Sequence, residues 1–128
     1  MSTKTRKIIS WSLVAVVASL FLMSASMKFK QDEATLNMAA AYGIDATTYL
    51  LIGIIEVASL VLFIIPRTGI LGTLLLASYM GGAIVTHLEH HEPVTMAVMV
   101  QTLVWITAFV RFPELKQRLF LTTKTIES

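Results

Sequence analysis

The apolar residues of this chain fall into four long blocks that almost no charged residue interrupts. The blocks cover residues 8–26, 49–65, 69–86 and 94–110. At about 1.5 Å per residue, each block is roughly 25 to 29 Å long as a helix, close to the thickness of the hydrocarbon core of a bilayer. Helices of a soluble bundle usually carry a charged stripe on the outer face, and these blocks lack one. The pattern predicts an all-α fold, an integral membrane four-helix bundle, with residues 1–128 as one domain.

Two shorter segments are predicted to lie at the membrane surface. Residues 32–42 have the pattern of a short helix, with Asp32 as its N-cap and Gly43 as its stop, and this helix is expected to lie across the outer mouth of the bundle. Residues 111–120 alternate basic and apolar side chains, as an interfacial helix does. Between the second and third blocks, Pro66 should end one helix and Thr68 should cap the next. These two blocks therefore form a tight antiparallel hairpin.

Composition excludes several classes of function. Hydrophobic residues make up 55% of the 128 residues and charged residues 14%, and the chain has no cysteine. Disulfides and thiol redox chemistry carried by this chain alone are therefore excluded. The net charge is only +2, and the cations border helix ends, where lipid headgroups account for them. No nucleic-acid partner is expected.

Basic residues predict how the chain is oriented in the membrane. With four crossings, both termini and the turn at Arg67 share one side. That side holds eight of the basic residues, namely Lys4, Arg6, Lys7, Arg67, Arg111, Lys116, Arg118 and Lys124. The opposite side holds Lys28 and Lys30. By the positive-inside rule, the N-terminus and the C-terminus are expected to be cytoplasmic.

Small residues mark two faces that are expected to pack against neighbouring helices. On the third block such residues recur at every fourth position, at Gly69, Thr73, Ala77 and Gly81. On the first block a related stripe is formed by Ser12, Ala15, Ser19 and Ser26. Small side chains let two backbones approach closely inside a membrane. The stripe on the first block is expected to point into the bundle.

Glu56 is the only acidic residue within the four blocks. A carboxyl group is expensive inside a membrane, so it requires a partner or a function. Counting from the outer boundary places Glu56 about 12 Å deep. Polar groups of other helices lie at a similar depth and are candidate partners: Ser19, Ser78, Tyr79 and Gln101. Trp105, one turn below Gln101, either lines an apolar pocket or packs.

Two interpretations of this polar layer stay open. In the first, the layer only holds the helices together, and Glu56→Gln should then leave folding largely intact, because an amide still forms hydrogen bonds. In the second, Glu56 marks a site for a small polar headgroup, a quinone carbonyl or a proton.

Three histidines lie between the third and fourth blocks. His87 and His91 are one helical turn apart, a spacing that can place two imidazoles on one face for a divalent metal. The helix is expected to end here, before Pro93, so a solvated polar loop is the preferred interpretation. Haem bound within a single chain is not expected, because all three histidines belong to one loop.

Several sequence runs resemble a known family. They are SMKF at 26–29, IGIIE at 52–56, IPRTG at 65–69 and ASYMGGAIVTH at 77–87. Together they resemble the DoxX-like family of small four-helix bacterial membrane proteins, over residues 11–119. The first run opens with Ser26 where the family usually has Gly, and the pair His90 and His91 is not typical of it.

The resemblance implies a multi-pass protein of the bacterial inner (cytoplasmic) membrane. Founding relatives are subunits of a thiosulfate to quinone oxidoreductase, which suggests a quinone as the ligand, and no other cofactor is implied. The family's polar positions match Lys28, Glu56, Tyr79 and His87, with Lys28 and His87 expected at the mouth and the other two below.

The leading hypothesis is an accessory or ligand-binding component of a respiratory or oxidative-stress system that is not catalytic by itself. It would bind a lipid or quinone headgroup near Glu56 through Lys28, Glu56, Tyr79, Gln101, Trp105, Ser19 and Ser78. One alternative is a membrane subunit of a quinone-linked oxidoreductase whose partner supplies the electron carrier. Another is an oligomeric small-solute exporter. The expected partners are the lipid bilayer and either a second copy of the chain or a membrane oxidoreductase.

Overall fold

The computed structural model describes residues 2–120, and over this range the chain is helical. The elements are α1 (Thr3–Lys30), α2 (Glu33–Ala41), α3 (Ala46–Ile64), the 3-10 turn η1 (Pro66–Thr68), α4 (Gly69–Glu89), α5 (Thr95–Arg111) and α6 (Pro113–Phe120). No strand occurs among the described residues. The predicted all-α fold is confirmed. Lys124, one of the basic residues used to predict orientation, lies outside the described range.

Helix length and hydropathy identify a multi-pass membrane protein. The helices α1 and α3 and the segment formed by η1 and α4 are each long and apolar enough to cross a membrane. The helix α5 meets this criterion only together with α6, from which it is bent by 107°. By length and composition the chain therefore has three spans, or four if the bent pair counts as one.

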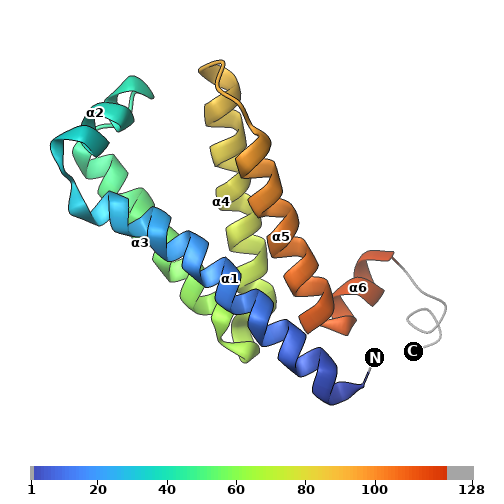
Figure 1. The fold of residues 1–128 in the computed structure, drawn as a ribbon. Helices are drawn as coiled ribbons and strands as arrows, with labels where there is room; N and C mark the ends of the chain where they lie inside the picture. The colour runs from blue at the N-terminus through green and yellow to red at the C-terminus, as the bar shows by residue number, and fades with distance from the viewer. Residues whose placement is uncertain (1, 121–128) are drawn as a thin grey trace.

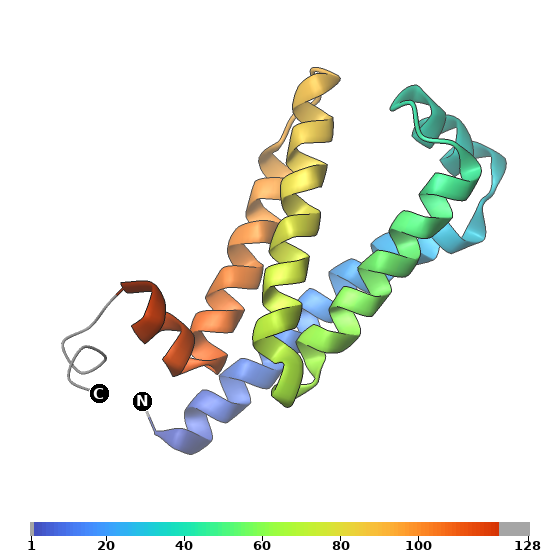
Figure 2. The ribbon, with the colours of Figure 1, turned by 180° about the vertical axis from the view of Figure 1, so that it is seen from behind.

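The long helices form two pairs that diverge from one another. Helix α1 packs against α3 and α5, and α4 packs against the same two helices. At the hairpin end, which holds η1, α6 and the start of α1, the pairs come together (Figure 1). At the loop end, which holds α2 and the connection from α4 to α5, the α1–α3 pair stands apart from the α4–α5 pair, as the opposite view also shows (Figure 2).

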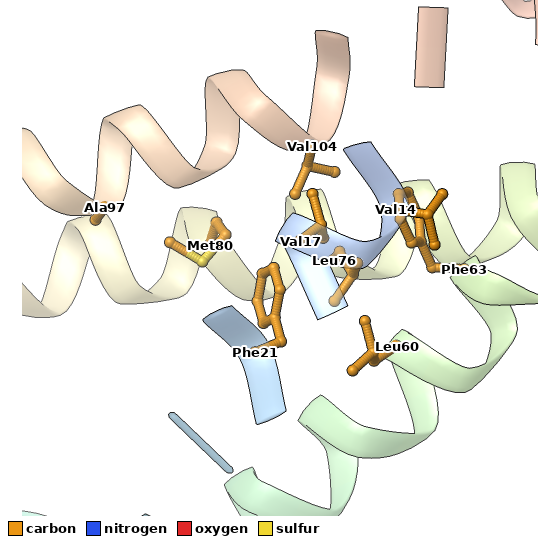
Figure 3. Packing of buried hydrophobic residues seen from close by; sticks show 9 residues of the cluster. All are labelled: Val14, Val17, Phe21, Leu60, Phe63, Leu76, Met80, Ala97 and Val104. Atoms are coloured by element: carbon orange, nitrogen blue, oxygen red, sulfur yellow. The ribbon is translucent and has the colours of Figure 1, made fainter. Parts of the chain in front are cut away.

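An apolar core fills the region where the four long helices converge. It consists of nine buried side chains: Val14, Val17, Phe21, Leu60, Phe63, Leu76, Met80, Ala97 and Val104. Figure 3 shows these side chains gathered between the helices. Glu56 precedes Leu60 by one turn of α3 and is therefore on the loop-end side of it. The buried polar residue Glu56 thus lies next to the loop-end boundary of the apolar core.

The serine stripe on α1 does not point into the bundle. Ser12, Ala15, Ser19 and Ser26 are exposed, and the buried face of α1 carries Val14, Val17 and Phe21 instead. The Ser12 and Ser19 hydroxyls donate to carbonyls of their own helix, each over 2.8 Å. A serine satisfied in this way can face lipid at little cost. The prediction was wrong because it took small polar residues for a packing face.

The small-residue face of α4 is packed only near the hairpin end. A Cβ atom on Gly69 would lie 2.2 Å from the Phe112 ring, whereas one on Gly81 would meet nothing within 4 Å. Thr73 is buried and Ala77 is half-buried. The closest backbone approach occurs at Gly72, where a Cβ would lie 2.1 Å from the Phe63 nitrogen. Among residues 2–120, the expected packing of Gly81 is therefore absent, because the helix pairs have already separated at that level.

The hairpin turn also differs from its prediction. The Thr68 hydroxyl does not cap α4; it donates over 2.8 Å to the carbonyl of Leu62, in the last turn of α3. This occurs because η1 runs directly into α4, so Thr68 does not have the extended backbone that an N-cap requires.

Both ends of α2 follow the sequence prediction. Asp32 caps α2 and Gly43, with φ of 74°, follows its end, while Asp45 caps α3. The hydroxyl and backbone N–H of Thr35 hold the pKa of Asp32 below its ordinary value. Thr48 lowers the pKa of Asp45 in the same way. These carboxylates remain charged acceptors for the first turns of the two helices.

Arg111, at the end of α5, joins that helix to the end of α3. Its guanidinium donates to the carbonyl oxygens of Phe63 and Ile64, which have no partner within α3. It also lies 5.1 Å from the Trp11 ring centroid and 4.9 Å from that of Phe112. One side chain thus closes the hairpin end of the bundle.

We expect Arg111→Gln to lower the free energy of unfolding by about 2–3 kcal/mol, because two charge-assisted hydrogen bonds and the aromatic contacts are lost. The free energy of unfolding of Arg111→Lys should lie between those of the original chain and Arg111→Gln, because an ammonium cannot reproduce the forked hydrogen bonds of the guanidinium. Thermal unfolding in detergent tests this, with exposed Arg118→Gln as the control. Equal shifts for Arg111→Gln and Arg118→Gln would contradict the assigned role.

Candidate functional site

A buried ion pair lies directly above the apolar core. The Lys28 Nζ is 3.0 Å from the Glu56 Oε2, and the two side chains are 10% and 1% exposed. The Tyr79 hydroxyl donates to the same Oε2 over 3.1 Å, and Lys28 also donates to the Ser24 Oγ over 2.8 Å. The site therefore joins α1, α3 and α4 through four polar side chains.

Local sequence explains how the lysine reaches the acid. Ser24 and Lys28 are four residues apart on α1, so both face α3 on the same side of the helix. On α3, Gly53 precedes Glu56 by three residues and lies one turn nearer the loop end. A Cβ on Gly53 would lie 2.9 Å from the Cβ of Lys28. Glycine at this position lets the aliphatic part of the lysine lie against α3.

Aromatic rings surround the ammonium group. The Lys28 Nζ lies 5.5 Å from the Tyr49 ring centroid and 5.9 Å from that of Tyr79. The Phe21 ring meets Tyr79 edge-on, with centroids 6.2 Å apart. Cation–π attraction at such distances adds to the ion pair, and it strengthens in a poorly hydrated site. The charge of Lys28 is thus compensated by a carboxylate, a hydroxyl and two ring faces.

One oxygen of the buried acid has no partner. Glu56 is 0% exposed, and its Oε1 accepts no hydrogen bond from any described residue. The Oε1 of Gln101 is in the same condition. A buried acceptor without a donor costs about 1–3 kcal/mol, so each such atom calls for an explanation. At Glu56 the explanation can be a donor supplied by a bound molecule, because this residue lines a cavity.

Two adjoining cavities open around the ion pair. The first, of about 390 Å³, is lined by Lys28, Tyr42, Ile44, Tyr49, Ile52, Ser78, Tyr79, Gly82, Ala83, Thr86 and His87. The second, of about 430 Å³, lies toward α1 and α5 and includes Glu56, Ser24, Met23, Met96 and Val100. Lys28, Tyr79, Ala83 and His87 line both. The divergence of the two helix pairs thus produces a mostly apolar cleft with a charged pair at its floor.

The rim of the cleft is aromatic and contains histidine. The Tyr42 ring lies 5.8 Å from that of His87 and 5.0 Å from that of His90, so the end of α2 reaches α4. The Nδ1 of His87 is 2.7 Å from the Ala83 carbonyl oxygen, which leaves the Nε2 of this ring as the one without a backbone partner. These contacts place the segment after α2 at the mouth.

The structure does not support the suggested metal site at His87 and His91. The helix α4 ends at Glu89, and His91 has a left-handed backbone with φ of 57°, so the two residues no longer share a helical face. Among the residues that the structure describes, no group of three histidine, aspartate or glutamate side chains could hold a metal ion.

The structure brings together only part of the predicted binding set. Lys28, Glu56 and Tyr79 form the site, and Lys28 lies buried within it, not at the mouth as expected. The prediction misplaced Lys28 because it ended the first helix at Ser26, whereas α1 continues to Lys30 and carries Lys28 on its buried face. Ser78 lines the first cavity, with its hydroxyl donating to the Leu74 carbonyl.

The other predicted members lie elsewhere. Ser19 is on the exposed face of α1, and Trp105 packs against Phe109 with ring centroids 5.8 Å apart. Gln101 lines neither cavity. Equal depth in the membrane was not enough to bring these side chains together, because they point in different directions around their helices.

Sequence reasoning missed Ser24, Gly53 and Tyr49. Each carries a weak signal that could have found it. Ser24 is one turn before Lys28, Gly53 is one turn before Glu56, and Tyr49 begins the span that contains the acid. Helical spacing from the two charged residues is thus more informative than depth alone.

Comparison with known proteins identifies a family for this chain. The model of the DoxX-like family matches residues 12–109, a range that contains Lys28, Glu56 and Tyr79. No curated protein and no solved structure matches the chain. Because the matched range covers most of the sequence, the chain belongs to the DoxX-like family.

Proposed function

We propose that this membrane protein binds the headgroup of a quinone beside Lys28 and Glu56. In this role it is an accessory or ligand-binding component of a respiratory or oxidative-stress system and does not catalyse a reaction by itself. The observation that carries the proposal is the unpartnered Oε1 of Glu56, buried next to a charge-compensated lysine in the wall of an apolar cavity.

The charges of the site favour a neutral headgroup. Lys28 and Glu56 compensate one another, so an added anion or cation would be buried without its own counter-charge, at a cost of several kcal/mol. A quinone is neutral and offers carbonyl oxygens to the ammonium of Lys28. Its reduced form has hydroxyl groups that can donate to the Glu56 Oε1. Both redox forms can therefore accept a hydrogen bond from Lys28, and the reduced form also supplies the donor that the Glu56 Oε1 lacks.

The cavities favour a ring with little polarity. Cavities of about 390 and 430 Å³ fall within the range of small-molecule sites, and most of their lining is apolar. Tyr49 and Tyr79 provide ring faces beside the ammonium, against which a flat headgroup can stack. A quinone ring meets these demands better than a phosphate headgroup does.

The basic residues support the orientation that we propose, and membership of the DoxX-like family supports the location. We place the chain in the bacterial inner membrane with both termini in the cytoplasm, and we place α5 across the membrane beside α4 and α1. Lys28 is buried in the ion pair with Glu56, so Lys30 is the exposed lysine at the loop end of the described chain. The asymmetry of exposed basic residues is therefore larger than the sequence count suggests. In this orientation the cleft opens toward the outer face.

Native mass spectrometry tests the proposal. We expect protein extracted gently from its own membrane to retain a quinone at fixed stoichiometry. The double variant Lys28→Met with Glu56→Met should lose this quinone while remaining folded, because it removes both polar contacts without leaving a buried charge. Ser19→Ala should retain it, because that residue lies outside the cleft.

Two results would overturn the proposal. One is equal quinone retention in the double variant and in the original chain. The other is retention of phospholipid alone, which would assign the site to a lipid. If Glu56 instead passes protons as part of a quinone-linked oxidoreductase, a partner must supply the electron carrier, and that partner should copurify with the chain.

A further inference from the structure

A groove runs along the outer surface of α5 beside α1. It has a volume of about 390 Å³ and is lined by Leu20, Met96, Val98, Met99, Val100, Thr102, Leu103 and Ile106. The helix α1 is long and apolar enough to span a membrane, and we place α5 across the membrane beside it, so in this placement the groove lies at the depth of the hydrocarbon core. The groove is therefore accessible to hydrocarbon chains and not to water.

The groove is continuous with the headgroup site. Leu20, Met96 and Val100 line both the groove and the cavity that contains Glu56. From the ion pair, the cavity extends into the space between α1 and α5. The groove begins where the cavity meets the surface of the bundle. A molecule whose polar end lies at Lys28 thus has a direct exit along α5.

The groove has the chemistry of a hydrocarbon site. No charged residue lines it, and the hydroxyl of its one polar side chain, Thr102, donates to the Val98 carbonyl over 2.8 Å. Two of its walls are Met96 and Met99, whose unbranched side chains adapt to irregular apolar ligands. A polar ligand would find no partner here.

We infer that this groove holds the hydrocarbon tail of the bound quinone, a polyprenyl chain that leaves the cleft between α1 and α5. The inference rests on the function proposed above. It adds a binding site for the hydrocarbon part of the quinone. The groove shares Leu20, Met96 and Val100 with the cavity that contains Glu56, so a ligand whose polar end lies at Lys28 can place a hydrocarbon tail in it. A phospholipid has two tails and a phosphate for which the neutral ion pair provides no counter-charge.

Binding of two benzoquinones with the same ring tests the inference, one without a side chain and one with a polyprenyl chain. The protein is placed in phosphatidylcholine nanodiscs, and the occupied fraction is measured by native mass spectrometry. Met99→Trp fills part of the groove, whereas Ile55→Trp adds the same side chain to a lipid-facing site on α3. The replaced residues are 61% and 57% exposed, so the variants are well matched.

We expect Met99→Trp to weaken binding of the polyprenyl quinone about tenfold and to leave the chainless quinone unchanged. Ile55→Trp should change neither. Val98→Phe provides a second variant of the groove in case Met99→Trp does not fold. Unchanged binding of the polyprenyl quinone in both groove variants would overturn the inference while leaving the headgroup site intact.

Other outcomes separate the two proposals. If the double variant at Lys28 and Glu56 binds both quinones as the original chain does, the headgroup site itself is wrong. If a phospholipid is retained instead and Met99→Trp releases it, the groove holds an acyl chain and the assignment to a quinone tail fails.

Discussion

Replacing Lys28 with Met is expected to lower the free energy of unfolding by about 3–5 kcal/mol, because it leaves the buried carboxylate of Glu56 without its counter-charge. The lost contacts are the 3.0 Å ion pair and the hydrogen bond to Ser24. Denaturant titration or thermal unfolding in detergent measures the effect. Lys30→Met is the matched control, since Lys30 is exposed on the same helix two residues later, and its effect should be within about 0.5 kcal/mol.

A double-mutant cycle separates the pair from its surroundings. Glu56→Met alone should also destabilise, because it leaves the Lys28 ammonium buried. Combining the two changes should recover most of the loss, since an apolar pair of similar volume is often as stable as a buried ion pair. Additive losses in the double variant would show that Lys28 and Glu56 do not act as a pair. The same ion pair reverses the expectation for Glu56→Gln, which should now destabilise the chain.

The second large effect is expected at Gly72. Gly72→Ala should lower the free energy of unfolding by about 3 kcal/mol, at the upper end for overpacking. The added Cβ would lie 2.1 Å from the Phe63 nitrogen and 2.3 Å from its Cα, and backbone atoms cannot turn aside as a side chain can. The helices α3 and α4 would have to move apart at the hairpin that fixes the bundle. Thermal unfolding and the yield of folded protein both report this change.

Gly82→Ala is the control for Gly72→Ala. It lies on the same helix, and its Cβ would meet nothing within 4 Å. Alanine favours a helix over glycine by up to about 1 kcal/mol, so this variant should be unchanged or slightly more stable. A similar loss in both variants would mean that the effect at Gly72 is not steric. A loss at Gly82 alone would indicate that the α4 surface is covered by another chain.

The sequence by itself determined the helices and their membrane character. Long apolar blocks without charge require helices in a bilayer, because every backbone group must be satisfied inside its own segment. The capping residues Asp32 and Gly43 fixed the short helix α2, since caps act within a few residues along the chain. The single acid in an apolar helix pointed to Glu56 as the centre of a site, because the cost of burying it does not depend on the details of packing.

Only the tertiary structure decided which side chains meet. Ser19 and Gln101 lie at nearly the same depth as Glu56, but neither forms a hydrogen bond with it, because depth does not fix the rotation of a helix about its axis. The partner is Lys28, whose path depends on the close approach of α1 to Gly53. The two helix pairs diverge (Figure 1). The cleft and the groove along α5 lie where side chains of different helices come together, so they too depend on this arrangement. Crossing angles arise from contacts between distant residues, and a linear pattern of apolar positions does not specify them.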